Sequence, residues 1–325
     1  MEICPYRFNL SSKINANNNI FCVFKSIENI YYLIYANKFD IISYNLNDMK
    51  IQNKINININ INYNENLGFC HHIIGHFFDK KNKRDLILIN TYLWMLIFNF
   101  NTMECVFSHK NYSSVGCLFF DKNTIFIYNQ EYSSINWEDT FTDLKENKVK
   151  KFPSIKAYFS DSYYDDNKGE SFIIVGTEKS LKSYICSDNI KVYHEFSDGT
   201  EIRHNFAMIK KEKEIEKLFD GSDDGYIRIW NFHTGELLNK ILICKNFRVF
   251  CFDFLDDKYI ICGTSKNIIE LFDIETKKFI KKLEGYFQNP YCIKAINITN
   301  DAQYLFAYSG TYKEIEILKI SKKDN

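Results

Sequence analysis

The sequence contains little proline and glycine, with 3 and 12 residues among 325, which excludes collagen-like and linker-rich proteins. It also has no excess of one charge: 41 Lys and Arg balance 41 Asp and Glu, so no net charge attracts nucleic acid or an anionic membrane. The most apolar stretch, 86–100, is short and contains Asn90 and Asn99, so we expect no membrane insertion. The N-terminus lacks a signal-peptide pattern, and we expect a cytoplasmic protein.

Patterns that carry catalysis or metal binding are missing as well. The ten cysteines form no C-x-x-C pair, which is typical of reduced, mostly buried thiols. The sequence has no G-x-G-x-x-G, P-loop, G-x-S-x-G or H-E-x-x-H motif. The cluster Cys70, His71, His72 and His76 would point to both faces of a strand, so it is not expected to bind zinc. We predict no enzyme activity, no cofactor, no metal and no small-molecule substrate.

The sequence shows almost no helix periodicity, and short runs rich in β-branched and aromatic residues dominate it. Polar turns such as Asp198-Gly199 and Asp224-Gly225 separate these runs, a pattern that indicates an all-β fold. A large apolar residue ends an inner strand at a mean interval of about 46 residues, close to the period of a propeller blade of four strands. These slots are Tyr44, Phe98, Trp137, Tyr184, Trp230, Phe272 and Leu318.

The sequence therefore predicts an all-β, seven-bladed β-propeller of four-stranded antiparallel blades in a single domain, residues 1–325. The last unit lacks an outer strand, so we expect the N-terminal strand, 2–14, to pair into the last blade and close the ring, which protects its edges. Rings of six or eight blades are the alternatives to this prediction. The predicted blades are 20–66, 67–110, 111–153, 154–200, 201–245, 246–286, and 287–320 plus 2–14.

One stretch of alternating residues stands apart from this pattern. Residues 54–62 alternate isoleucine with polar residues, mostly asparagine, which predicts a strand with one apolar face. We interpret it as the outer strand of the first blade. The alternative is an exposed edge that pairs with a partner strand.

The run from Gly221 to Asn231, GSDDGYIRIWN, resembles a blade of the WD-repeat (Trp-Asp repeat) β-propeller family, with Asn231 where Asp is usual. In that family an Asp, a Trp, a His and a Ser or Thr form a buried hydrogen-bond network. The resemblance implies such a structural network here from Asp224, Trp230 and His204. The Ser or Thr position is held by Asp220, which is a departure from the family pattern.

The resemblance also implies a non-catalytic protein-protein interaction scaffold, which binds a peptide or domain of another protein on the loop face of the propeller. Arg and Tyr dominate binding hot spots. A mildly basic, aromatic rim suits an acidic or phosphorylated peptide. The expected rim residues are Tyr112, Lys156, Arg203, Arg248 and Tyr291.

Three rival functions stay open. The first is a substrate receptor of a ubiquitin ligase, which would need an adaptor-docking element. The second is a module that binds RNA or associates with the ribosome; we do not favour it, because the lysine runs are interleaved with Asp and Glu. The third is a propeller enzyme, which would need His and carboxylate groups that converge at the channel mouth.

Overall fold

The computed structural model describes most of the chain. The described ranges are 4–16, 21–37, 40–56, 73–79, 82–90, 94–110, 114–120, 124–129, 139–143, 149–152, 157–165, 167–186, 190–212, 215–283, 290–299, 302–309 and 313–323.

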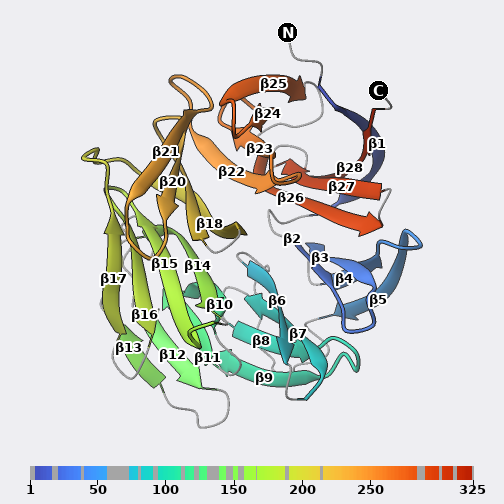
Figure 1. Ribbon diagram of the computed structural model, residues 1–325. Coiled ribbons are helices and arrows are strands. Elements are labelled where there is room, and N and C mark those ends of the chain that lie inside the picture. Colours follow the sequence, from blue (N-terminus) through green and yellow to red (C-terminus); the bar gives the residue numbers. More distant parts are fainter. Residues whose placement is uncertain are drawn as a thin grey trace. The chain divides into compact units, whose positions relative to one another are not determined.

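The chain forms β-propeller blades, each a four-stranded antiparallel sheet, and it divides into two compact units (Figure 1). The unit Ala16–Lys156 holds three sheets. Their strands are β2 (Phe21–Lys25), β3 (Tyr31–Asn37), β4 (Asp40–Asn45), β5 (Lys50–Asn56); β6 (Ile73–Asp79), β7 (Arg84–Asn90), β8 (Trp94–Asn99), β9 (Cys105–Lys110); and β10 (Ser114–Phe120), β11 (Thr124–Asn129), β12 (Asp139–Asp143), β13 (Val149–Phe152).

The other unit comprises Met1–Asn15 and Ala157–Asn325 and holds four sheets. Their strands are β14 (Ala157–Asp165), β15 (Glu170–Thr177), β16 (Leu181–Cys186), β17 (Ile190–Phe196); β18 (His204–Glu212), β19 (Ile215–Ser222), β20 (Tyr226–Asn231), β21 (Leu237–Leu242); β22 (Val249–Phe254), β23 (Tyr259–Thr264), β24 (Ile268–Asp273), β25 (Lys278–Leu283); and β26 (Pro290–Thr299), β27 (Ala302–Ser309), β28 (Glu314–Lys322), β1 (Tyr6–Asn15).

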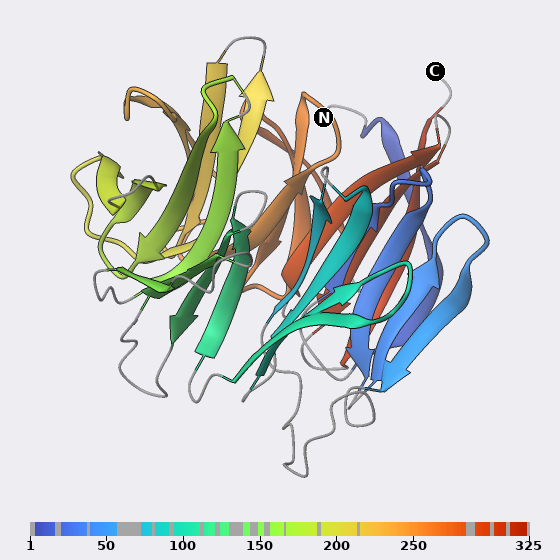
Figure 2. The ribbon, with the colours of Figure 1, turned by 90° about the horizontal axis from the view of Figure 1, so that it is seen from below.

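The N-terminal strand belongs to the last sheet, as the sequence led us to expect. β1 pairs antiparallel with β28, from Tyr6 opposite Lys322 to Asn15 opposite Glu314. Figure 1 and Figure 2 show this blue strand beside the red C-terminal strand. The pairing covers the edge of β28, which would otherwise present unpaired backbone groups.

The predicted closed ring of seven blades is corrected here. Six of the seven slot residues lie on the third strand of a sheet, but Trp137 lies outside the described residues, and β12, the third strand of that sheet, begins after it at Asp139. Side chains are described in six blades, whereas the sheet β10–β13 is described by its backbone alone. A sequence period counts strand-turn units, and it does not establish that they close into one ring.

Apolar layers between neighbouring sheets hold each unit together. In β15 six consecutive residues are buried, because both faces of the strand are covered. Between the blades β14–β17 and β18–β21 the rings of Phe172 and Phe232 meet edge to face at 5.1 Å, and Phe196 packs against Trp230 at 5.8 Å. Such pairs add about 0.5–1.5 kcal/mol each beyond the area they bury. This packing fixes the blade that carries the family-like motif.

Two sequence features lie partly outside the described residues. The predicted alternating strand at 54–62 is described as far as Asn56, where β5 ends. Of the histidine and cysteine cluster, Cys70, His71 and His72 lie outside the description. Among the described residues, no helix has the length and apolar character needed to cross a membrane.

Candidate functional site

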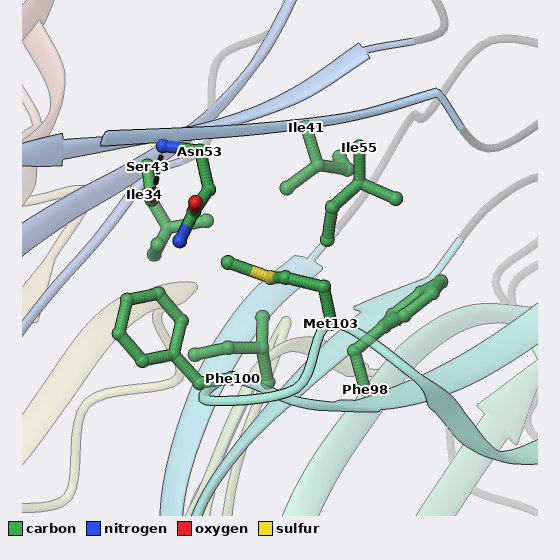
Figure 3. Close-up of a pocket in the computed structure, with 9 residues that line it drawn as sticks. Ile34, Ile41, Ser43, Asn53, Ile55, Phe98, Phe100 and Met103 are labelled. Atoms are coloured by element: carbon green, nitrogen blue, oxygen red, sulfur yellow. Dashed lines mark hydrogen bonds between the residues drawn. The ribbon is translucent and has the colours of Figure 1, made fainter. Parts of the chain in front are cut away.

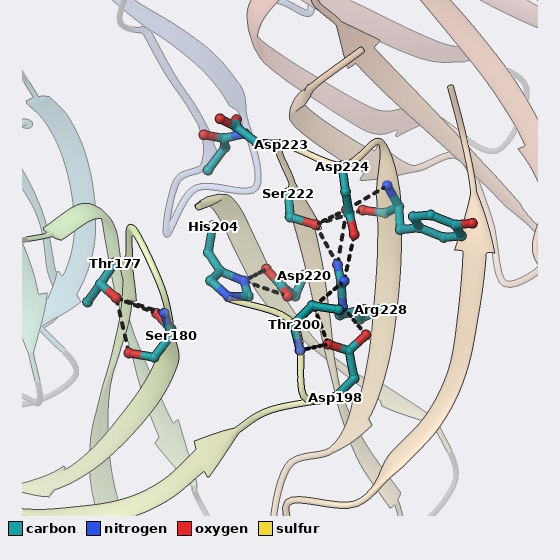
Figure 4. A network of polar contacts seen from close by, with 12 residues as sticks. Thr177, Ser180, Asp198, Thr200, His204, Asp220, Ser222, Asp223, Asp224 and Arg228 are labelled. Carbon is teal, nitrogen blue, oxygen red and sulfur yellow. Dashed lines mark hydrogen bonds and ion pairs between the residues drawn. The ribbon is translucent and has the colours of Figure 1, made fainter. Parts of the chain in front are cut away.

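The blade β18–β21 carries a dense group of polar contacts at the end where its second and third strands turn (Figure 4). The turn 222–226 is tight because Gly225 has a φ of 82°, and a Cβ there would lie 1.8 Å from the carbonyl oxygen of Cys244. Asp224 Oδ1 accepts hydrogen bonds from Ser222 Oγ at 2.8 Å and from the Tyr226 amide at 3.2 Å. The turn therefore places one carboxylate at the start of β20.

Arg228, on β20, lies at the centre of this group and is 1% exposed. Its guanidinium donates to Asp224 Oδ2 at 2.6 Å and to Asp198 Oδ2 at 2.9 Å. It also donates to Ser222 Oγ at 2.6 Å and to Thr200 Oγ1 at 3.0 Å. Since Asp198 and Thr200 precede β18, Arg228 fastens the loop between two blades to the middle of the second blade.

The two carboxylates around Arg228 are held in the ionised form. Burial by itself would raise the pKa of Asp198, but hydrogen bonds from Lys240, Thr200 and Arg228 outweigh it and lower this pKa. The pKa of Asp224 is lowered in the same way, because hydrogen bonds from Arg228 and Ser222 outweigh its burial. Two cations, Arg228 and Lys240, thus face two carboxylates, and the charges of the group balance.

The predicted network does not form as one unit. His204 Nδ1 donates to both oxygens of Asp220, at 2.9 and 2.8 Å, and both side chains are buried. Asp224 belongs to the separate group around Arg228. Trp230 is buried, but among the described residues its Nε1 has no hydrogen-bond partner, which corrects the expectation that it joins the network. Asp220, in the Ser or Thr position, binds the histidine directly and leaves the indole to packing.

Sequence reasoning missed Arg228 and its partners, although one signal was present. Tyr226, Arg228 and Trp230 are every second residue of β20, so Arg228 shares a face of the strand with the buried Trp230. A charged residue on that face must be paired when it is buried. The acidic partner Asp198 lies in a turn that also reads as an ordinary Asp-Gly turn, so its role could not be recognised.

Two of the predicted rim residues, Arg203 and Arg248, occupy equivalent places in neighbouring blades. Arg203 directly precedes β18 and Arg248 directly precedes β22. The backbone oxygen of each accepts the amide of a residue in the turn after the second strand: Asp223 at 3.0 Å for Arg203 and Ser265 at 2.9 Å for Arg248. We use the name loop face for the end of these blades formed by residues 177–180, 197–203, 222–226, 243–248 and 264–268.

The two arginine side chains differ in their surroundings. The guanidinium carbon of Arg203 lies 3.6 Å from the centre of the Tyr158 ring, and its buried Nε makes no hydrogen bond among the described residues. The Arg248 side chain is 52% exposed, and its Nε lies 3.3 Å from Asp223 Oδ2. Asp223 Oδ1 in turn accepts a hydrogen bond from Asn205 Nδ2 at 2.8 Å. The loop face thus presents one guanidinium stacked on a tyrosine and one half-exposed guanidinium paired with Asp223.

The remaining predicted rim residues lie outside what the structure describes. Tyr112 and Lys156 fall between described segments, and Tyr291 lies on β26 without a described side chain. Lys156 nevertheless directly precedes β14 in the sequence, the same place that Arg203 and Arg248 hold before their strands.

A separate pocket lies between the blades β2–β5 and β6–β9 (Figure 3). Its polar lining residues are Ser43 and Asn53, and the Asn53 amide donates to Ser43 Oγ at 3.0 Å. None of its described lining residues is titratable. The other lining residues are Ile34, Ile41, Ile55, Ile87, Phe98, Phe100 and Met103.

His76, the described member of the predicted histidine and cysteine cluster, has a structural setting. Its Nε2 lies 2.8 Å from Asp85 Oδ1, and its ring stacks on Phe24 at 3.9 Å. The Asp85 side chain also accepts the Ile27 amide at 2.9 Å and so joins two blades of the same unit. These contacts explain His76 without a metal.

Comparison with known proteins adds no further identification: no protein-family model matches the chain, and no curated protein matches it.

Proposed function

We propose that the chain is a WD-repeat-like β-propeller that acts in the cytoplasm as a non-catalytic protein-interaction scaffold. The four-stranded blades are consistent with such a module. The turn Asp224-Gly225 and the buried Trp230 support the family likeness, and the direct pair between His204 and Asp220 is a departure from it. The fold by itself does not fix the function, so the proposal depends on the loop face.

The observation that carries the proposal is the repeated basic residue before the innermost strand. Arg203 and Arg248 stand at the same place in neighbouring blades. We propose that these residues hold an acidic or phosphorylated peptide of a partner protein. Arginine suits this task, because its planar fork can donate two parallel hydrogen bonds to a carboxylate or a phosphate.

The surroundings of each arginine support this role. Stacking on Tyr158 orders the Arg203 side chain before binding, so less conformational entropy is lost when a ligand arrives. The Arg248 side chain is half exposed and can turn from Asp223 to an incoming anion. Phe247, 40% exposed and covered by Lys266 Nζ at 5.0 Å from its ring centre, adds apolar area beside them. The partner would thus meet both charge and an aromatic surface.

The test is affinity capture from the organism's own cells, with quantitative mass spectrometry of the retained proteins. The tagged wild-type chain is compared with the double variant Arg203→Ala, Arg248→Ala. The control is Lys191→Ala, Lys278→Ala, which removes two charges from the outer strands β17 and β25. We expect a defined set of proteins to be retained by the wild type and the control and to be lost from the double variant.

The same captures separate the rival functions. If all three forms retain the same set, the loop face is not the binding surface and the proposal fails. If nuclease treatment releases the set, RNA carries the interaction. If the set consists of ubiquitin-ligase subunits and depends on the two arginines, the partner class becomes a ligase adaptor and the surface assignment still holds.

A further inference from the structure

At the opposite end of the same blades, three side chains that can bind a metal converge. Asp165, Glu216 and His233 each offer one ligand atom, and these atoms all lie within 4.8 Å of one another. They come from three separate segments: the end of β14, the start of β19 and the turn after β20. We propose that this cluster binds a divalent transition-metal ion, with zinc as the expected ion.

The backbone holds each of the three segments firmly. Asp165 Oδ1 accepts the amides of Asn167 at 2.9 Å and Lys168 at 3.3 Å, which fixes the carboxylate at the start of its turn. The Glu216 backbone oxygen accepts the Phe232 amide at 2.9 Å, which joins β19 to the turn that carries His233. The donor atoms are therefore largely preorganised, as a metal site requires.

The turn that carries His233 is tied down on both sides. The His233 amide donates to Asn231 Oδ1 at 3.0 Å, and His194 Nε2 donates to the His233 backbone oxygen at 2.6 Å. A Cβ at Gly235 would lie 3.3 Å from His194 Nδ1, so the second histidine packs closely under the turn. The imidazole of His233 is 25% exposed, which leaves an ion a path from solvent.

Burial and charge make the cluster unusual. Asp165 and Glu216 are 1% and 3% exposed, and two buried carboxylates side by side are unfavourable without a cation. Asp165 Oδ2 has no hydrogen bond among the described residues and faces His233 Nε2 at 3.8 Å. Two lysines lie near the cluster: Lys168 Nζ lies 3.0 Å from His233 Nδ1, and Lys211 Nζ lies 4.0 Å from Glu216 Oε1. Asp165 Oδ2 thus lies within 4.8 Å of the other two ligand atoms and makes no hydrogen bond to a described residue.

In two other blades, the residue at the position of Glu216 makes a direct hydrogen bond to the preceding blade. The second residue of the second strand reaches the first turn of the preceding blade: Asp85 accepts the Ile27 amide, and Gln303 Nε2 donates to the Leu255 backbone oxygen. Glu216 holds the same position in β19, but the group that it meets in the preceding blade is the Asp165 carboxylate. Two like charges replace a direct hydrogen bond here, and a bound cation would restore the link.

The donor set fits zinc. Imidazole nitrogen and carboxylate oxygen both bind zinc, and a site with three protein ligands keeps one position open. Around a tetrahedral zinc ion, bonds of about 2.1 Å place neighbouring ligand atoms about 3.4 Å apart. His233 Nε2 lies 2.7 Å from Glu216 Oε2 and 3.8 Å from Asp165 Oδ2, so small side-chain rotations suffice. Tyr193 OH lies 3.1 Å from His233 Nδ1 and can accept a hydrogen bond from the Nδ1–H when Nε2 binds the ion.

The rival is a cluster without a metal, held by the contact of His233 Nε2 with Glu216 Oε2 at 2.7 Å and with Asp165 Oδ2 at 3.8 Å. Two substitutions separate the two cases. Glu216→Gln keeps an oxygen that accepts from Nε2 but removes the charge that a metal needs, and Asp165→Asn does the same on the other side. His76→Gln is the matched control, because the His76 pair has a single carboxylate, Asp85, at 2.8 Å.

The experiment is isothermal titration calorimetry of the full chain with ZnCl₂ in two buffers of different ionisation enthalpy, under a reductant. Cobalt spectra on the same samples distinguish N and O ligands from thiolates. We expect one site that releases a proton on binding, shows no thiolate charge-transfer band, and raises the melting temperature by about 2 °C or more. Glu216→Gln and Asp165→Asn should each weaken binding at least tenfold, while His76→Gln should leave it unchanged.

Three results would overturn the proposal. The first is no binding to the wild-type chain. The second is binding that survives both Glu216→Gln and Asp165→Asn, which would place the zinc elsewhere. The third is thiolate coordination in the cobalt spectrum, which would assign the ion to the cysteines. All three readouts are independent of the peptide-binding function proposed above.

Discussion

Asp223 Oδ2 lies 3.3 Å from Arg248 Nε, and the same residue donates its backbone amide to the Arg203 oxygen at 3.0 Å. One acidic residue thus joins the two arginines that we assign to partner binding. It orders them, but its carboxylate also competes with any anion that approaches Arg248. In the absence of a partner, the Asp223 carboxylate therefore occupies the place at Arg248 that we assign to the acidic group of a partner.

The change Asp223→Asn should therefore strengthen the binding of anionic peptides. The side-chain oxygen of the new asparagine can still accept the hydrogen bond from Asn205, but the charge that competes for Arg248 is removed. We therefore expect a gain of about threefold to tenfold in affinity. Fluorescence anisotropy with a labelled peptide pool that contains a central phosphoserine measures it. Asp257→Asn is the control, because Asp257 is fully exposed and pairs with Lys210 at the other end of the blade. An unchanged affinity in Asp223→Asn would mean that Asp223 does not compete.

Arg228→Met should destabilise the fold by about 3–5 kcal/mol at neutral pH, because it leaves the carboxylates of Asp198 and Asp224 without their buried partner. Their pKa values are lowered in the folded state, so their stabilising contribution is present above about pH 4 and is lost as the pH falls further. The difference between wild type and variant should therefore shrink below pH 4.

Urea unfolding at several pH values checks this. Lys179→Met serves as the control, since Lys179 and Glu201 form an exposed pair on the loop face, and it should not change the unfolding midpoint. A variant as stable as the wild type at pH 7, or a difference that does not depend on pH, would show that Arg228 is not the centre of the group.

Trp230→Phe should cost little, about 1 kcal/mol or less, because the indole nitrogen forms no hydrogen bond that the variant would lose. Trp230→Ala, which leaves a cavity beside Phe196, should cost about 3–5 kcal/mol. Thermal and urea unfolding of the two variants distinguish packing from hydrogen bonding. Equal losses in both would indicate that Trp230 does belong to a polar network.

The sequence predicted the strands well because their signals are local. Alternating β-branched and aromatic runs end at polar turns, and the runs around Tyr184, Trp230 and Phe272 form strands as predicted, each the third of its sheet. The partner of the N-terminal strand could be predicted for another reason, because the last unit lacked an outer strand. Trp137 lies outside the described residues, and β12, the third strand of the sheet β10–β13, ends at Asp143 without a large apolar residue there.

The side-chain networks could be predicted only in part. The position of His204 follows from its spacing to Trp230, but its partner Asp220 takes the histidine in place of the indole. Contacts between distant segments, such as Asp198 with Arg228, depend on how two blades pack, and no local pattern encodes them. The cluster of Asp165, Glu216 and His233 was missed for that reason too, since its members are far apart in the sequence.

The most direct test of the central claim is the affinity of the loop face for an anionic peptide, measured by anisotropy with phosphoserine-centred, glutamate-centred and serine-centred pools. The account predicts that the wild-type chain and Lys191→Ala, Lys278→Ala bind an anionic pool more tightly than the serine pool. It predicts that Arg203→Ala, Arg248→Ala loses at least tenfold in affinity with its unfolding midpoint unchanged. Equal binding of all pools, or full binding by the folded double variant, would contradict it.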